Sequence, residues 1–219
     1  MKISQFPLEI TPELAEETGW HIGDGSMNFY EGRGLYQLRG HIEDDRAHYI
    51  IRIAPIFKKL YGIDISLREM PSTRVFGFQI WNNELIKFKE RLGLKVGPKL
   101  DLTIPEIFLI NDELKTAVLR GIFDTDGCIY LERKNHKLYP RMEIMTISIK
   151  LAQQITELFN NLNLRTTMYK DASSYRGNRR NAYKITIRGN EMLHRFMKVI
   201  KPANPKHIAK YEFYQKSFK

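Results

Sequence analysis

The chain has 219 residues, of which 42% are hydrophobic, so it can bury a core as one large domain or two domains of about 100 residues. No stretch approaches the roughly 18 apolar residues of a membrane span, and the N-terminal segment lacks the apolar centre of a signal peptide. A single cysteine, Cys128, excludes an internal disulfide and a cysteine-rich zinc site. We therefore expect a soluble intracellular protein with no membrane partner.

The net charge of +10 is concentrated near the C-terminus. Residues 165–219 carry 14 Lys and Arg against 3 Asp and Glu, so the rest of the chain is close to neutral. A basic surface of this size favours a polyanionic partner, and nucleic acid is the commonest one.

The first predicted element is a helix that occurs twice. Thr11 and Asn111 are suitable N-caps, and the two helices close with "ETGWHIGDG" (17–25) and "LRGIFDTDG" (119–127), which share their third-place Gly and final Asp-Gly. The same offset relates "FKKL" to "FNNL", and a slightly larger one relates "FGFQIWNNEL" to "YKITIRGNEM" and "GPK" (97–99) to "NPK" (204–206). The chain therefore consists of two half-repeats, residues 8–100 and 111–219, joined by a connecting segment, residues 101–110.

The later elements follow in the same order in each half. Residues 34–42 alternate as a strand, with hairpin tips at "YEGRG" and within residues 131–141. A helix then covers 49–62 or 151–163, with a kink at Pro55, and is followed by strands that include 75–81 or 183–189 and by a helix at 83–93 or 190–200. This order predicts an α+β fold of two pseudo-symmetric αββαββα half-repeats, each with an antiparallel sheet that exposes one face.

Small residues on the two opening helices indicate how the aspartates at the helix ends are arranged. Gly19 and Gly23 are four apart, as are Gly121 and Thr125, so each helix presents a face on which two backbones can approach closely. Packing of the two helices would bring Asp24 and Asp126 together, and two close carboxylates repel unless a cation such as Mg²⁺ lies between them. A single Asp-Gly would indicate an ordinary turn. Its recurrence at equivalent positions favours a metal site.

The two nine-residue motifs and the matching order of elements resemble those of the LAGLIDADG homing endonucleases, in the single-chain form with two motifs. The resemblance implies that Asp24 and Asp126 are metal-binding catalytic acids, with the main-chain carbonyls of Gly23 and Thr125 as further ligands of Mg²⁺ or Mn²⁺. It also implies a basic residue near the active site late in each half. The matching "GPK" and "NPK" make Lys99 and Lys206 the candidates, and such lysines could offset charge on the attacked phosphate or help activate water.

Two other motif residues are assigned structural roles. Asp124 has no acidic counterpart, because Ile22 occupies the equivalent place in the first motif. His21 could be a metal ligand or a general base, but it lies a turn before Asp24, and we expect it to be a packing or surface residue.

The exposed sheet faces are predicted to lie in the DNA major groove, where Arg and Gln suit guanine and adenine edges. The segment "SSYRGNRRN" (173–181) is interpreted as a flexible arm for phosphates or a flanking groove, and three of its arginines join the predicted contacts. The predicted DNA-binding residues are Gln37, Arg39, Arg68, Gln79, Tyr130, Lys134, Arg141, Arg176, Arg179, Arg180, Lys184 and Arg188.

These observations predict a site-specific, double-strand DNA endonuclease that hydrolyses one phosphodiester on each strand of a long duplex. Because both motifs lie in one chain, we expect a monomer. The alternative is a cleavage-inactive nucleic-acid binding protein of the same fold, either a maturase that assists intron RNA or a regulator. A nucleotide-using enzyme is disfavoured, because "GDGSMNFYEGRG" has neither Walker nor Rossmann spacing.

The absence of a splicing His-Asn pair favours a freestanding or intron-encoded protein over an intein-embedded one. In a prokaryotic host the expected location is cytoplasmic and nucleoid-associated, and an organellar location is left open.

Overall fold

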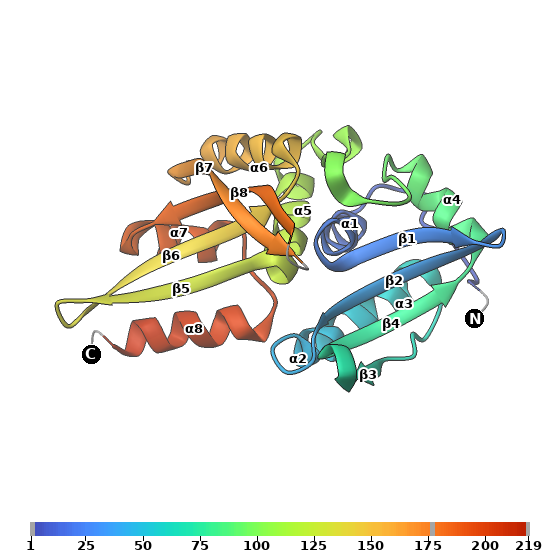
Figure 1. Ribbon diagram of the computed structural model, residues 1–219, viewed down its shortest axis with the longest axis horizontal. Coiled ribbons are helices and arrows are strands. Elements are labelled where there is room, and N and C mark those ends of the chain that lie inside the picture. Colours follow the sequence, from blue (N-terminus) through green and yellow to red (C-terminus); the bar gives the residue numbers. More distant parts are fainter. Residues whose placement is uncertain (1–2, 176–177, 218–219) are drawn as a thin grey trace.

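The computed structural model describes residues 3–175 and 178–217 and consists of two halves built on the same plan (Figure 1). The N-terminal half contains α1 (Pro12–Asp24), β1 (Gly25–Tyr30), β2 (Arg33–His41), α2 (Arg46–His48), the π-helical turn η1 (Tyr49–Ile53), α3 (Ala54–Tyr61), β3 (Arg68–Met70), β4 (Val75–Trp81) and α4 (Asn83–Arg91). The C-terminal half contains α5 (Asp112–Asp126), β5 (Gly127–Lys134), β6 (Lys137–Thr146), α6 (Ile149–Asn161), β7 (Thr166–Tyr175), β8 (Asn178–Arg188), α7 (Asn190–Val199) and α8 (Pro205–Lys216).

Each half has one four-stranded antiparallel sheet with the same strand order. The orders are β1-β2-β4-β3 and β5-β6-β8-β7. The predicted α+β fold with two half-repeats is therefore confirmed, and the C-terminal half adds α8, which was not predicted. No helix in the described ranges is long and apolar enough to cross a membrane.

The two halves meet through α1 and α5, which lie side by side at the centre of the molecule with one sheet to each side (Figure 1). A Cβ added to Gly19 would lie 2.3 Å from the Val118 carbonyl oxygen, and one added to Gly121 would lie 2.1 Å from that of Glu16. Any larger residue at these positions would push the helices apart. The close packing predicted from the small residues is thus what the structure shows.

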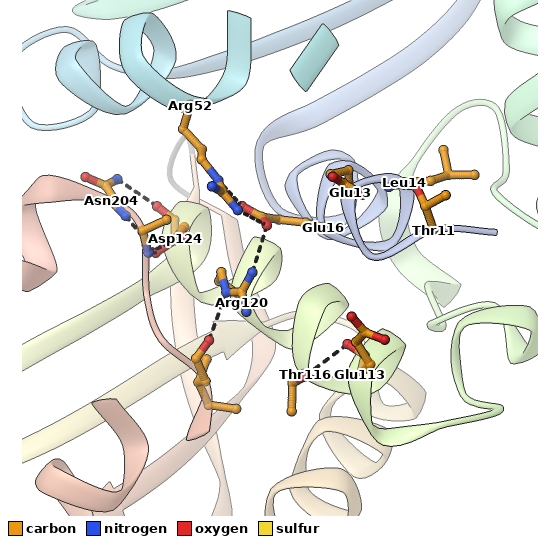
Figure 2. Close-up of polar contacts among 12 residues, drawn as sticks. Thr11, Glu13, Leu14, Glu16, Arg52, Glu113, Thr116, Arg120, Asp124 and Asn204 are labelled. Atoms are coloured by element: carbon orange, nitrogen blue, oxygen red, sulfur yellow. Dashed lines mark hydrogen bonds and ion pairs between the residues drawn. The ribbon is translucent and has the colours of Figure 1, made fainter. Parts of the chain in front are cut away.

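A buried ion-pair cluster joins the two central helices near their middle (Figure 2). Both carboxylate oxygens of Glu16, on α1, accept hydrogen bonds from Arg52, at 2.8 Å from Nε and 2.7 Å from Nη2. Arg120, on α5, donates to Glu16 Oε2 at 2.9 Å and to the Ile200 carbonyl at 2.9 Å. The cluster links the two halves and the segment that precedes α8.

The helix boundaries agree with their predicted signals. The Thr11 hydroxyl accepts from the Leu14 N–H at 3.2 Å, and the Asn111 side chain accepts from the Leu114 N–H at 2.9 Å. Both motif helices pass directly into strands at Gly25 and Gly127, whose backbones are extended. A Cβ at Gly25 would lie 2.4 Å from His21 Nδ1, so glycine is needed there for close approach.

The predicted kink at Pro55 takes the form of a wider helical turn. Residues 49–53 form η1, in which the Ala54 N–H bonds to the Tyr49 carbonyl, five residues back, and α3 then continues through Pro55. Because proline lacks an N–H and its ring crowds the preceding turn, the widening next to it has a direct cause.

One segment predicted to be a loop contains paired strands. Residues 173–175 and 178–180 extend β7 and β8, with Ser173 opposite Arg180 and Ser174 opposite Arg179. The prediction of a loop at residues 173–181 was therefore wrong in the described part, and the predicted contact of this segment with DNA stays a prediction. The polar composition of the segment suggested a loop, but pairing with a neighbouring strand satisfies its backbone groups equally well.

Candidate active site

The structure brings the last residues of α1 and α5 together. A Cβ at Gly23 would lie 2.0 Å from Thr125 Oγ1 and 3.3 Å from the carboxyl carbon of Asp126. The negative charge of Asp126 raises the pKa of Asp24, so the two predicted acids lie close enough to interact. Packing at the glycines is what places one carboxylate from each half at the same spot.

The electrostatics of this pair are unfavourable for two free carboxylates. Burial, with smaller contributions from the negative charges of Asp126 and Asp45, raises the pKa of Asp24 to about 8, and Lys206 and Lys99 oppose this rise. Desolvation raises the pKa of Asp126 to about 6, against Lys99 and Lys206. Asp126 is exposed to solvent, so water offsets part of its shift. A cation between the two carboxylates would relieve this repulsion.

Lys99 lies against the end of α1. Its ammonium donates to the carbonyls of His21 and Ile22, each at 2.9 Å, and to that of Gly23. Burial lowers the pKa of Lys99 to about 8, against the opposing effects of Asp126 and then Asp24. Lys99 and Asp126 share a pocket of about 290 Å³ that is also lined by Gly23 and Thr146.

Lys206 reaches the same region from the other half, but through a residue that the sequence did not single out. Its Nζ donates to Asp45 Oδ1 at 2.7 Å, and Asn204 Nδ2 donates to the same oxygen at 2.8 Å. Asp45 is 5% exposed and follows β2. Asp45 precedes α2 in the turn that follows β2, and no sequence pattern singled it out.

The predicted carbonyl ligands have different environments. The Gly23 carbonyl already accepts from Lys99, so it faces the cationic side of the site. Thr125 lies in the helix interface, where its hydroxyl donates to the carbonyls of Gly121 and Ile122, each at 3.0 Å.

The two residues assigned structural roles are buried. The Asp124 carboxylate accepts from the backbone N–H groups of Ala203, at 2.9 and 3.1 Å, and Asn204, at 3.1 Å (Figure 2). It therefore anchors the segment before α8, as a structural aspartate should. His21 is 2% exposed and stacks on Tyr36 with ring centroids 5.4 Å apart, so the packing interpretation is confirmed.

The donor set fits a hard divalent cation that keeps part of its shell for other ligands. Two carboxylates and nearby carbonyl oxygens are the ligand types that Mg²⁺ and Mn²⁺ prefer. Across residues 3–175 and 178–217, no group of three or more His, Cys, Asp and Glu side chains could hold a metal by itself. Water and a substrate phosphate would have to complete the coordination.

The open face of the first sheet carries the residues predicted to face away from the core. Tyr36 and Leu38 are fully buried on the helix side, whereas Gln37 and Arg39 lie on the other face. Gln79 Oε1 accepts from Gln37 Nε2 at 3.2 Å and from Arg39 Nη2 at 3.1 Å, which forms a polar ladder across β2 and β4. Arg68 is exposed beside this ladder, opposite Gly77.

The open face of the second sheet also matches the predicted alternation, but it contains acids that were not predicted. Arg141 lies opposite Arg188 in the register, stacks over Tyr130 at 4.8 Å, and lies 3.8 Å from Glu132 and 3.7 Å from Glu143. Lys134 pairs with Glu132 at 2.9 Å, and Lys184 pairs with Asp171 at 3.2 Å. Arg179 and Arg180 belong to β8, and Arg176 lies outside the described residues. The same alternation that selected the cations could have found these carboxylates.

Part of the chain is similar in sequence to a known family and to parts of larger proteins. Residues 113–201 match the family model of the LAGLIDADG-like domain. A glutamine–fructose-6-phosphate aminotransferase of Methanocaldococcus jannaschii is 29% identical over 132 residues, which are 59% of this chain and 11% of that protein. The ribonucleoside-diphosphate reductase NrdEB subunit alpha of Bacillus subtilis is 28% identical over 169 residues, which are 73% of this chain and 15% of that protein. The chain thus spans only a small part of these curated relatives.

Solved structures with the same fold cover most of the chain. A structure of mesophilic variants of the homing endonuclease I-DmoI has a TM-score of 0.63 at 18% identity, covering 90% of this chain and 97% of that one. I-DmoI in complex with DNA and Ca has a TM-score of 0.63 at 18% identity, covering 92% and 97%. The LAGLIDADG meganuclease I-AabMI bound to uncleaved DNA has a TM-score of 0.55 at 13% identity, covering 95% and 90%. Residues 113–201 thus match a LAGLIDADG-like domain, and over most of its length the chain has the fold of these solved structures.

Proposed function

We propose that the chain is a site-specific DNA endonuclease that hydrolyses one phosphodiester on each strand of a long duplex. The observation that carries this proposal is the pair Asp24 and Asp126, one from each half, held together at the ends of α1 and α5. A protein that only binds nucleic acid gains nothing from two close carboxylates, because they repel phosphate. Both motifs lie in one chain, so a monomer suffices for an asymmetric target.

The two open sheet faces supply the DNA-binding surface. They carry Arg, Lys, Gln and Tyr side chains at alternating positions, which suits contacts with base edges in the major groove. Related structures of I-DmoI and I-AabMI were solved bound to DNA, which supports the same partner here. The polar ladder of Gln37, Arg39 and Gln79 is fixed before binding, so less side-chain freedom is lost on contact.

Asp24 and Asp126 would hold divalent metal, either Mg²⁺ or Mn²⁺, which when bound activates water and stabilises the leaving oxygen. Structures of I-DmoI with Ca or Mn and of a variant with Mg support a divalent ion. Two lysines of the chain would contribute as well. The positive charges of Lys99 and Lys206 lower the pKa of both aspartates, and Lys99 lines a pocket with Asp126, so the two lysines can offset charge on the attacked phosphate.

The test is selection of cleaved molecules from a randomised or host-derived duplex library, with sequencing of both new ends. We expect one long target, a cut on each strand, and complete loss of cutting when EDTA removes the divalent ion. Enrichment of bound sequences with no cut in either Mg²⁺ or Mn²⁺ would contradict the endonuclease and favour the cleavage-inactive alternative, and a parallel selection from intron RNA would then test for a maturase.

A further inference from the structure

We propose that Arg141 and Glu143 together read one C·G base pair of the DNA target, so that the C-terminal sheet requires this base pair at one position. Glu143 accepts from the cytosine amino group, and Arg141 donates to the guanine of the same pair. This inference rests on the proposed endonuclease function, because it needs duplex DNA against the open sheet faces. It starts from the presence of a carboxylate at the centre of such a face, where it would repel phosphate.

Arg141 and Glu143 lie in the middle of the open face of the second sheet. They alternate along β6 with Met142 and Ile144, each 2% exposed, which lie on the helix side. β6 is an inner strand, with β5 on one side and β8 on the other. The two side chains therefore lie where the base edges of a bound groove, rather than its phosphates, would meet the sheet.

Glu143 keeps hydrogen-bonding capacity that its ion pair does not use. The distance from Glu143 Oε1 to Arg141 Nε is 3.7 Å, which is an ion pair but is too long for a hydrogen bond. Across the sheet, Glu143 lies opposite Cys128 on β5 and Thr186 on β8. The Thr186 hydroxyl is buried and has no hydrogen-bond partner among the residues that the structure describes. The Glu143 carboxylate can therefore accept a hydrogen bond from an incoming donor.

Few of the base edges in the major groove can donate to a carboxylate. Guanine presents the acceptors N7 and O6, and thymine presents O4 and a methyl group, so neither base donates to Glu143. Adenine presents a donor at N6 beside an acceptor at N7, and this acceptor repels the second carboxylate oxygen. Cytosine presents its N4 amino group with no adjacent acceptor of its own. Cytosine is therefore the base that Glu143 selects.

The Arg141 guanidinium is aligned but not saturated with hydrogen bonds. It stacks over Tyr130 at 4.8 Å and lies between Glu143 and Glu132, whose Oε2 is 3.8 Å from Arg141 Nη2. Its Nε is buried without a hydrogen-bond partner in the described ranges, which is costly, so a base that brings an acceptor is favoured. Arginine donates to guanine O6 and N7, and O6 lies next to cytosine N4 in the same base pair. An adjacent arginine and glutamate therefore match both bases of one C·G pair.

Other cations of the open faces have closer partners. The ammonium groups of Lys134 and Lys184 lie 2.9 and 3.2 Å from carboxylate oxygens, within hydrogen-bond distance. In the first sheet, Arg39 donates to the side-chain amide of Gln79 at 3.1 Å. An amide both donates and accepts, so it fits more than one base. The strict requirement for C·G therefore belongs to the pair on β6.

The experiment uses the full chain to select duplexes from a randomised library by binding in Ca²⁺, without requiring cleavage. We expect C·G at one position of the wild-type site, and replacement of this base pair should weaken binding on the order of 10- to 100-fold. Glu143→Gln should change the preferred base from C to A, because a glutamine amide accepts from adenine N6 and donates to N7. Arg141→Met should relax the preference at the same base pair.

Glu132→Gln is the matched control. It removes a carboxylate from the same open face, but one that Lys134 already binds. This variant should keep C·G as the preferred base pair. Binding of each variant to its own selected duplex with an affinity near that of the wild type shows that the variant is folded.

An unchanged preference in Glu143→Gln, or changes at different base pairs in the Glu143 and Arg141 variants, would overturn the assignment. The same change in Glu132→Gln would also overturn it. A wild-type chain that selects a duplex but cuts neither strand in Mg²⁺ or Mn²⁺ would contradict only the endonuclease, since base preference is measured by binding. A chain that enriches no sequence would remove both proposals.

Discussion

Four aspartates near the ends of α1 and α5 behave differently because their partners differ. Asp124 has two backbone N–H groups and fixes the chain before α8. Asp45 has a lysine, an amide and a backbone N–H. Asp24 lies near Asp126, whose negative charge raises the pKa of Asp24, and a bound cation would relieve this repulsion. Residue type alone could not separate these roles, but the repeat separated Asp124 from Asp126.

Glu16 is the residue whose loss should most weaken the contact between the halves. Glu16→Gln leaves Arg52 and Arg120 close together without their carboxylate (Figure 2), and breaking a buried pair costs about 3 to 5 kcal/mol. Arg52 is 37% exposed in its side chain, so solvent reduces this to about 2 kcal/mol of unfolding free energy. Urea denaturation of the wild type and of Glu16→Gln measures this loss of unfolding free energy. Glu84→Gln breaks an exposed pair with Lys87 and is the matched control, and an equal loss in both variants would contradict the account.

Buried histidines should make the protein sensitive to acid. Burial lowers the pKa of His48 to about 3, against the opposing charge of Asp45, with Lys206 and Arg52 adding to the lowering. Burial also lowers the pKa of His207 well below its usual value. In the unfolded chain both titrate near 6.5, so their contribution to stability is present above pH 6.5 and is lost as the pH falls toward 3.

The measurement is the free energy of unfolding at pH 7.5 and pH 5 for the wild type and His48→Phe. Each buried histidine contributes about 1.4 kcal/mol per pH unit in this window, so the loss between the two pH values should be smaller in His48→Phe. His136→Asn, at an exposed turn, should keep the wild-type pH dependence. An identical loss in His48→Phe would show that His48 does not stay neutral in the folded protein.

The packing of α1 against α5 is the element on which the site depends. Gly121→Ala places a methyl group 2.1 Å from the Glu16 carbonyl oxygen, where backbone rather than a flexible side chain must give way. We expect a loss of about 1 to 3 kcal/mol in unfolding free energy and slower cleavage, since the aspartates at the helix ends move apart. Glu157→Ala, on the exposed face of α6, is the control and should be nearly neutral. Unchanged stability and cleavage in Gly121→Ala would contradict the close packing.

At the level of elements, local patterns in the sequence predicted most of what the structure shows. Strand alternation identified the open faces that carry Gln37, Arg39 and Arg141, because period two follows from the pleat itself. The same alternation places Glu132 and Glu143 on the open face with Arg141, but a prediction limited to side chains that attract DNA leaves these acids out. The pairing of residues 173–175 with residues 178–180 was missed because strand formation depends on packing context more than on local composition.

At the level of the whole molecule, the internal repeat predicted the pseudo-symmetric architecture, and departures from that symmetry are what it could not predict. Lys206 was placed at the site by its match to Lys99, yet its partner is Asp45 from the other half. A buried cluster in the N-terminal half was also unforeseen: Glu17 accepts from Tyr36 and Tyr61, each at 3.1 Å, and pairs with Lys89. Such contacts join residues that no local pattern relates.

The central claim is that Asp24 and Asp126 form one metal-dependent site for cutting both strands. Its most direct test is the single-turnover cleavage rate of the selected duplex in Mg²⁺ for Asp24→Asn and Asp126→Asn, with Asp44→Asn as control and DNA affinity measured for each protein. We expect both variants to bind DNA as the wild type does and to lose cleavage by at least about 100-fold on the affected strand. Wild-type cleavage of both strands by either variant would contradict the claim.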